Sequence, residues 1–297
     1  MHGSTIVSEQ LADGRAFAES VAGVVARHHE IPDWTPGGTD VAGSSTRLAE
    51  ALHSLGWLSL AEDPELVVCA GLAGVELGRA AAPVSALDQL LGAAPLAGDL
   101  IRCPTWTGRQ SLDSHPRGVG LVVQASKPAT AGPREIVRRP VSGGESCPSP
   151  EGLDVWRVTD TGDAEPVDAD TWAIAWGAWV AASTGYLAGL GEAALQLTVE
   201  YVRERAAFGT TLGALAPVQQ LLADAATAVR GVTLLCADAP GEDALRHAGP
   251  AISGACDACH QVTGAIGYTL EYPLHGYSQR ARALATWNDA LLDAFAG

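Results

Sequence analysis

The 297-residue chain contains 34 acidic and 18 basic residues, which gives it a formal net charge of −16 at neutral pH. Its composition, 47% hydrophobic and 18% charged, is that of a folded chain with a sizeable core, not of a disordered one. The negative charge argues against nucleic acid or an anionic membrane as the main partner, because phosphate groups would be repelled. No charged segment followed by an apolar run opens the chain, and its six cysteines are widely spread except for the last pair, Cys256 and Cys259. We therefore expect a cytoplasmic protein with free thiols.

Residues 1–97 are predicted to form a helical N-terminal domain. Apolar side chains recur every three or four residues around Phe17–Val25 and again around Leu48–Leu58, which is the helical period. The Pro/Gly-rich segment Pro32–Ser45 separates these two runs. A further helix is expected at Leu66–Ala82, because a proline follows it directly.

Residues 98–168 are predicted to form a small, shortened β-domain. Clusters of Pro, Gly and Ser separate short runs of residues that favour strands. These runs are Val119–Val123, Glu135–Val141 and Leu153–Val158.

Residues 169–297 are predicted to form a four-helix bundle. Asp170 is the expected N-cap of a long first helix that ends near Ala207. Three more helices with short connections follow, at Pro217–Asp238, Gly241–Gly264 and Tyr277–Phe295. The expected fold class is therefore mainly α with a small β-domain between two helical parts.

The segment Thr171–Gly191 has no formal charge and is long enough to cross a bilayer. It is rich in Gly and Ala, however, and continues directly into the charged stretch Glu200–Arg205. A helix that is apolar on all sides is also what the interior of a bundle or a subunit interface requires. We therefore predict a buried helix and no membrane partner.

Two stretches of the bundle carry groups suited to a ligand. Arg203 and Arg205 end the long helix just before Gly209, and an arginine fork near the start of a helix can hold a diphosphate. The alternative is a solvated arginine face. In the second stretch, Gly264 permits close backbone approach and Gln261 lies one turn before it, although an ordinary helix C-cap explains the same pattern.

Together these stretches resemble the acyl-CoA dehydrogenase family. The resemblance rests on three motifs in the family's order: R-x-x-F-G at Arg205–Gly209, L-A-D at Leu222–Asp224, and Q-x-x-G-x-x-G-Y-T-x-E-Y-P at Gln261–Pro273. Leu55–Leu58 and Val75–Pro83 are similar to early helices of the family. The resemblance implies a helical N-domain, a small β-domain and a C-terminal four-helix bundle with the subunit contacts, and FAD bound between subunits.

The resemblance also implies which residues contact FAD. Arg205 and Phe208 would hold the diphosphate and the adenine half of an FAD whose flavin ring sits in the neighbouring subunit. Four further positions are expected to contribute to the same nucleotide contact: Gln219, Gln261, Gly264 and Ala265. The glutamine that the family usually has three residues before Gln219 is Ala216 in this chain.

The chain departs from the family at the catalytic base. The family places a glutamate either on the long helix, which corresponds to Trp179, or on a later loop, which corresponds to Asn288. Neither an indole nor a carboxamide accepts a proton at neutral pH. Asp289 is adjacent and would supply a base if the alignment shifted by one residue. The β-domain also lacks the family's T-E-P-x-x-G-S-D run, which faces the flavin ring.

These departures suggest the degenerate subunit of an α2β2 heterotetramer, similar to actinobacterial acyl-CoA dehydrogenases of steroid side-chain degradation. The expected partners are a homologous, complete subunit and an acyl-CoA, with a steroid-CoA as one candidate. One alternative is a homo-oligomeric dehydrogenase that uses Asp289 as its base. Another is a non-catalytic scaffold that keeps the bundle for oligomerisation.

Cys256–His260 matches the haem-attachment pattern C-x-x-C-H. It falls inside the third helix of the predicted bundle, where the family has an ordinary helix, so we expect no haem. A zinc site would need two more ligands at suitable spacing, and none lies close in the sequence, so no metal site is predicted.

Overall fold

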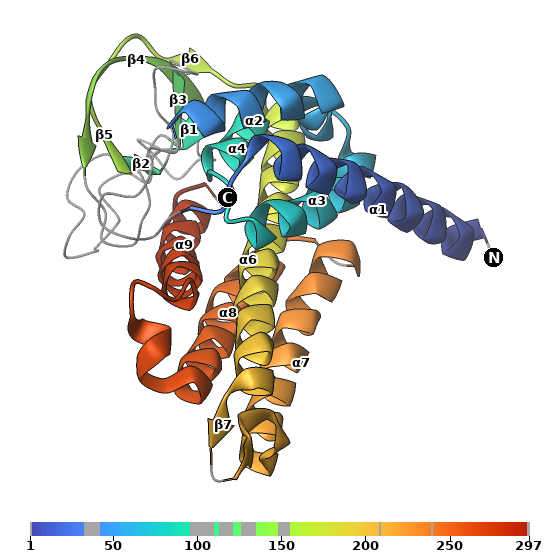
Figure 1. Ribbon diagram of the computed structural model, residues 1–297. Coiled ribbons are helices and arrows are strands. Elements are labelled where there is room, and N and C mark those ends of the chain that lie inside the picture. The colour runs from blue at the N-terminus through green and yellow to red at the C-terminus, as the bar shows by residue number, and fades with distance from the viewer. Residues whose placement is uncertain are drawn as a thin grey trace.

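The computed structural model describes residues 2–32, 42–95, 110–112, 121–125, 135–147, 155–207, 209–238 and 240–295. Figure 1 shows N-terminal helices beside a small sheet, and long helices that extend away from both. This is the mainly helical architecture with a small β-part that the sequence predicted.

The N-terminal part is helical, as expected. α3 ends at Arg79, earlier than the predicted end at Ala82, because Ala81 has a φ of +48° that breaks the helical path before the proline is reached. The elements are α1 (His2–His28), α2 (Ala42–Leu55), η1 (Trp57–Ala61), η2 (Pro64–Leu66), α3 (Val67–Arg79), α4 (Ser85–Asp88) and η3 (Gln89–Leu91).

The sheet has six strands. Five of them pair in the order β1-β3-β4-β5-β2, and the sixth, β6, also pairs with β4. β1 and β3 are parallel, and the other pairs are antiparallel. Glu135–Val141 falls largely on β4; the first two residues of Val119–Val123 and of Leu153–Val158 lie outside the described residues. The strands are β1 (Ala94–Pro95), β2 (Gln110–Leu112), β3 (Leu121–Ala125), β4 (Ile136–Cys147), β5 (Val155–Thr161) and β6 (Glu165–Pro166).

Four long helices form the C-terminal part: α6 (Ala169–Glu204), α7 (Ala216–Asp238), α8 (Glu242–Thr263) and α9 (Leu274–Phe295). Asp168, not Asp170, caps α6, because its carboxylate accepts hydrogen bonds from the Thr171 backbone N–H at 3.0 Å and hydroxyl at 2.9 Å. α6 ends at Glu204, before the predicted Ala207, because the backbone turns extended at Arg205 and enters a short hairpin. That hairpin pairs β7 (Ala206–Ala207) with β8 (Thr210–Thr211).

One hydrophobic core joins the N-terminal helices to the bundle. Its members come from α1, α2, α3 and all four long helices, and Trp57, Trp179, Trp287 and Tyr186 are among its largest fully buried side chains. Within Thr171–Gly191, every residue from Ala178 onward is buried, so this segment is the centre of α6. Among the described residues, only α7 is long and apolar enough to span a bilayer by length and composition, and its stripe Ala225, Val229, Val232 and Cys236 is buried against the other helices.

Glycines bring α3 and α6 into direct backbone contact. A Cβ at Gly74 would collide with the carbonyl oxygen of Ala182, and one at Gly78 with that of Tyr186. In the opposite direction, a Cβ at Gly185 would collide with the carbonyl oxygen of Gly71, and one at Gly189 with that of Val75. The two helices therefore cross at a separation that no larger side chain permits at these positions.

The backbone carbonyls that follow α3 accept hydrogen bonds from three other elements. His29, just after α1, donates from Nε2 to Ala80 at 3.1 Å, and Tyr277 of α9 donates to Arg79 at 3.1 Å. Buried Arg280 of α9 donates from Nη1 to Ala81 at 2.5 Å and to Ala82 at 3.1 Å. Tyr186 of α6 also donates to Ala82, at 2.5 Å. These bonds fix the chain at the left-handed residue and satisfy carbonyls that would otherwise be buried without partners.

His29 is held neutral in this environment. Its side chain is buried, and its Nδ1 has no hydrogen-bond partner among the described residues. Burial lowers the pKa of the His29 imidazole, and the Arg280 charge adds to this effect, while the bond to the Ala80 carbonyl opposes it. His260 on α8 is also buried, and its pKa is lowered first by burial and then by Arg282.

We expect Gly185→Ala to lower the free energy of unfolding by about 2 kcal/mol or more, because the backbones of α3 and α6 must move apart. Gly177→Ala is the matched control on the same helix, since its Cβ would meet nothing within 4 Å. That control should be neutral or stabilising by up to about 1 kcal/mol from helix propensity. Urea unfolding of both variants measures the difference, and equal stability would contradict the close crossing.

The lowered pKa values predict that stability falls as the pH drops. Near pH 6.5 the unfolded chain begins to bind protons at His29 and His260, while the folded chain binds them only at lower pH. The free energy of unfolding should therefore decrease as the pH falls from the pKa of each histidine in the unfolded chain to its lower pKa in the folded chain. Above the unfolded-state pKa, the free energy of unfolding should keep its full value. His29→Gln should flatten this pH dependence in urea unfolding, whereas His53→Gln, at an exposed position of α2, should leave it unchanged.

Candidate functional site

The turn from α6 to α7 presents polar side chains to solvent. Arg205 follows α6 directly; its N–H bonds to the Tyr201 carbonyl, and its own carbonyl accepts from Leu212 at 2.8 Å across the hairpin. The Arg205 guanidinium is exposed and forms no ion pair with the described residues. Gln219 is exposed in the first turns of α7, and its Nε2 donates to the Gly213 carbonyl at 2.9 Å.

The turn from α8 to α9 has an open backbone at the expected glycine. Gly264 caps α8 with a φ of +64° and begins η5 (Gly264–Tyr268), and a Cβ added there would meet nothing within 4 Å. Gln261, in the last turn of α8, and Ala265 are both exposed. The backbone is therefore accessible at the position where the motif predicts close approach of a ligand.

Both turns lie at the same end of the bundle. The four helices alternate in direction, so the ends of α6 and α8 and the starts of α7 and α9 meet there (Figure 1). Tyr272 ties the two turns together: its ring contacts Tyr201 edge-on at 6.0 Å, and its hydroxyl donates to the Leu197 carbonyl at 2.8 Å. We call this the nucleotide end, defined by Arg205, Gln219, Gln261, Gly264 and Ala265.

The residues of the nucleotide end fit half of a dinucleotide. A guanidinium, two carboxamides and an open glycine are groups that bind a diphosphate and the polar edges of a base. Arg205, Gln219, Gln261 and Ala265 are exposed on the surface. Phe208, expected to act beside Arg205, lies outside the described residues.

Trp179, the first expected base position, is packed into an aromatic cluster at the other end of α6. Its side chain is 2% exposed and stacks on Trp176 at 4.9 Å, and Trp176 stacks on Trp172 at 5.5 Å. Phe295 of α9 contacts Trp172 and Trp176 at 5.2 and 5.4 Å. The spacing of these tryptophans at i, i+4 and i+7 places them on one face of α6 and could have indicated the cluster from the sequence.

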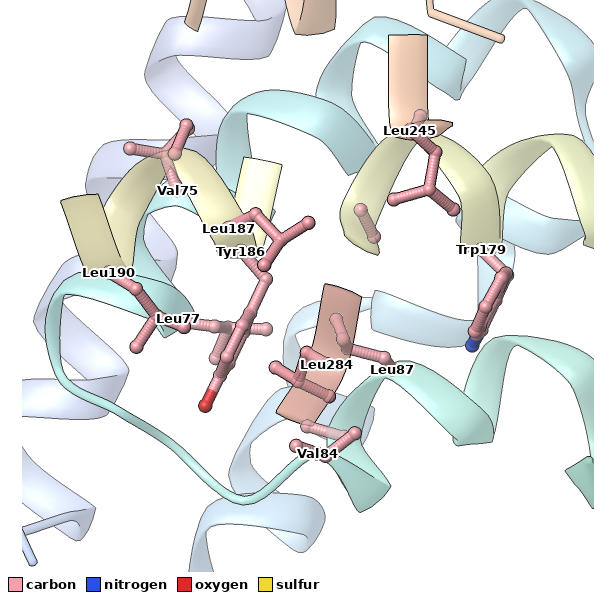
Figure 2. Packing of buried hydrophobic residues seen from close by; sticks show 14 of the residues in the cluster. Val75, Leu77, Val84, Leu87, Trp179, Tyr186, Leu187, Leu190, Leu245 and Leu284 are labelled. Carbon is pink, nitrogen blue, oxygen red and sulfur yellow. The ribbon is translucent and has the colours of Figure 1, made fainter. Parts of the chain in front are cut away.

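The cluster contains a buried carboxylate that the motifs did not identify. Asp88, at the end of α4, is 4% exposed, and its Oδ1 accepts a hydrogen bond from Trp179 Nε1 at 3.3 Å. Figure 2 shows Trp179 and Tyr186 on α6, beside the segment that carries Val84 and Leu87. An acid that directly follows Ala86 and Leu87 was the available clue in the sequence.

Asn288, the second expected base position, is also buried, at 4% exposed on α9. Asp289 is exposed, because one step along a helix turns the side chain by about 100°. Partial burial raises the pKa of the Asp289 carboxyl; nearby Arg246 opposes this and Asp293 adds to it. Arg246 itself pairs with Asp293 at 2.8 Å, so Asp289 lies beside a surface ion pair between α8 and α9.

The C-x-x-C-H pattern lies within α8, as predicted. Cys256 and Cys259 are buried, and burial raises the pKa of both thiols. Thiols that are buried and protonated are poor ligands and poor nucleophiles. Among the described residues, no group of three or more His, Cys, Asp or Glu side chains could hold a metal ion.

Comparisons with known proteins agree with this geometry. Residues 171–288 match the family described as acyl-CoA dehydrogenase, C-terminal domain. Comparison with curated proteins gives no match. Glutaryl-CoA dehydrogenase from Mycobacterium smegmatis is similar in structure, with a TM-score of 0.69 and 14% identity over 93% of this chain and 91% of the other.

Two similar structures have titles that name pairs of proteins. One is the ChsE4–ChsE5 complex from Mycobacterium tuberculosis, with a TM-score of 0.63 and 17% identity over 94% of each chain. The other is a variant of the Tcur3481–Tcur3483 steroid ACAD, with a TM-score of 0.63 and 16% identity over 97% of this chain and 98% of the other. Residues 171–288 are therefore similar to the C-terminal domain of acyl-CoA dehydrogenases, and the chain as a whole has the fold of these solved structures.

Proposed function

We propose that this chain is a subunit of an FAD-dependent acyl-CoA dehydrogenase that lacks the catalytic base and completes the FAD site of a homologous partner. The observation that carries the proposal is the contrast between the two ends of the bundle. The expected base positions, Trp179 and Asn288, carry groups that cannot accept a proton and are buried among other side chains. The nucleotide end is exposed and polar.

The Trp179 side chain is inaccessible, with only 2% of it exposed. A base that removes the α-proton has to lie within hydrogen-bond reach of the substrate. Here the indole of Trp179 is stacked on Trp176 and bonded to Asp88, so protein atoms fill the space that a substrate would need. The α-proton would therefore be removed by a carboxylate of the partner.

The nucleotide end would act on the partner's cofactor. When bound, FAD accepts the hydride from the β-carbon of the CoA thioester. Arg205 would pair with the diphosphate, and Gln219 and Gln261 would bond to polar edges of the nucleotide. Gly264 and Ala265 would let the backbone approach it closely.

The partner and substrate follow from the resemblance and are supported by the similar structures. A protein pair and a steroid ACAD are among the similar structures, which favours an α2β2 assembly acting on a steroid-derived acyl-CoA in the cytoplasm. The bundle supplies the surface for such an assembly, since α7 is apolar overall and buries only one stripe within this chain.

Arg205→Ala should weaken FAD retention in the complex that this chain forms on co-expression with a homologous, complete subunit. Loss of a charge-assisted hydrogen bond of about 1.5–3 kcal/mol corresponds to roughly 10- to 100-fold weaker binding. The visible flavin absorbance of the purified complex measures this. Arg15→Ala, at an exposed arginine of α1 outside the bundle, is the control and should retain the flavin.

Two outcomes would contradict the proposal. A chain that alone binds one FAD per protomer and oxidises an acyl-CoA would be a complete homo-oligomeric enzyme. A colourless oligomer that ignores every homologous subunit would be a scaffold without a catalytic role.

Asp289→Asn tests the homo-oligomeric alternative, which the raised pKa of Asp289 favours. Under our proposal, the substitution leaves turnover of the complex unchanged, because Asp289 lies on the exposed side of α9 beside Arg246 and Asp293. Steady-state kinetics together with flavin content provide the measurement. Loss of turnover with full flavin content would instead identify Asp289 as the base.

A further inference from the structure

An apolar surface interrupts the polar nucleotide end. Among the described residues, five large hydrophobic side chains are exposed, and three of them lie in the turn after α8: Ile266 at 42%, Tyr268 at 68% and Leu270 at 47%. This concentration within five consecutive residues is unlike the scattered single exposures that are normal on a protein surface.

The Tyr268 ring is held in place by a buried histidine. It stacks on His260 with the ring centroids 4.3 Å apart and the planes at 19°. His260 is 3% exposed, and its Nδ1 has no hydrogen-bond partner among the described residues. One face of Tyr268 is therefore covered by His260, and its high exposure places the other face in solvent.

Neighbouring residues closely surround the imidazole of His260. A Cβ at Gly267 would come within 3.1 Å of His260 Nδ1 and collide with the Thr263 hydroxyl. The backbone of η5 therefore packs directly against the His260 imidazole. Thr263 in turn donates to the Cys259 carbonyl at 2.9 Å. Burial lowers the pKa of His260, with Arg282 and His275 adding to the effect and Asp257 opposing it, so the imidazole that supports Tyr268 is neutral at pH 7.

We propose that Tyr268, supported by His260, stacks on the adenine base of the dinucleotide that the nucleotide end binds, with Ile266 and Leu270 covering the edges of the base. This inference rests on the proposed function and adds a residue that the motifs did not assign. A flat ring with one free face suits a flat base, and stacking of a base on an aromatic side chain contributes about 1–3 kcal/mol.

Arg205 and Gln261 complete the recognition of an adenine nucleotide. Both are exposed at the same end of the bundle, and the contact of Tyr272 with Tyr201 joins their two turns. The guanidinium suits the diphosphate, and the carboxamide can both donate to and accept from the edge of the base. This end of the bundle thus combines a stacking surface with one group for the diphosphate and one for the polar edge of the base.

The test uses the isolated chain with ADP as the probe and inorganic pyrophosphate as the probe without a base. Tyr268→Ala should weaken ADP binding by roughly 5- to 150-fold, the equivalent of the stacking contribution, and leave pyrophosphate binding unchanged. Tyr268→Phe keeps the ring and should bind ADP like the parent chain. Ile31→Ala, at an exposed apolar position outside the bundle, is the control. Equal binding of ADP and pyrophosphate by the parent chain, or no effect of Tyr268→Ala, would overturn the proposal.

The assembled complex separates this inference from the proposed function. Normal assembly of Tyr268→Ala with reduced FAD retention supports the stacking role. Failed assembly with unchanged ADP binding by the isolated chain would mean that the surface docks a protein, which overturns it. If no homologous subunit gives a flavin complex but ADP binding still depends on Tyr268, the proposed function fails and the stacking surface stands.

Discussion

The glycine-lined crossing of α3 and α6 is the constraint on which the rest of the structure depends. Carbonyl oxygens of each helix occupy the positions where side chains would project from the other, so the two backbones touch at Gly74, Gly78, Gly185 and Gly189. This contact fixes α6, the longest helix, against the N-terminal part of the chain. The end of α3 is then secured by His29 and by side chains of α6 and α9, which donate to the carbonyls of Arg79–Ala82.

With α6 fixed, its two ends have opposite character. The end near the N-terminal helices is filled by stacked indoles whose N–H groups bond to the carboxylates of Asp88 and Glu242. The far end presents arginine, glutamine and an open glycine to solvent. This contrast between a packed end and a polar, exposed end is the observation on which the proposed function rests.

The motifs of the bundle predicted much of this arrangement. Periodicity located the long helices to within a few residues, and Pro217, Gly241 and Gly264 marked helix ends correctly because each constrains the backbone directly. The errors lie at positions where tertiary contacts compete with local preference. α3 ends early, at Arg79, because Ala81 leaves the helical path where carbonyls are bound from other elements. Asp168 caps α6 because it, not Asp170, reaches the Thr171 N–H.

The sequence by itself determined the helical character, the family resemblance and the residue types at Trp179 and Asn288, because these depend on local spacing and side-chain chemistry. Only the tertiary structure decided that Asp88 lies against Trp179, that His260 supports Tyr268, and that Asn288 is buried while Asp289 is exposed. Such facts depend on which faces of helices far apart in the chain pack together. For α6, the backbone contact with α3 is part of that packing.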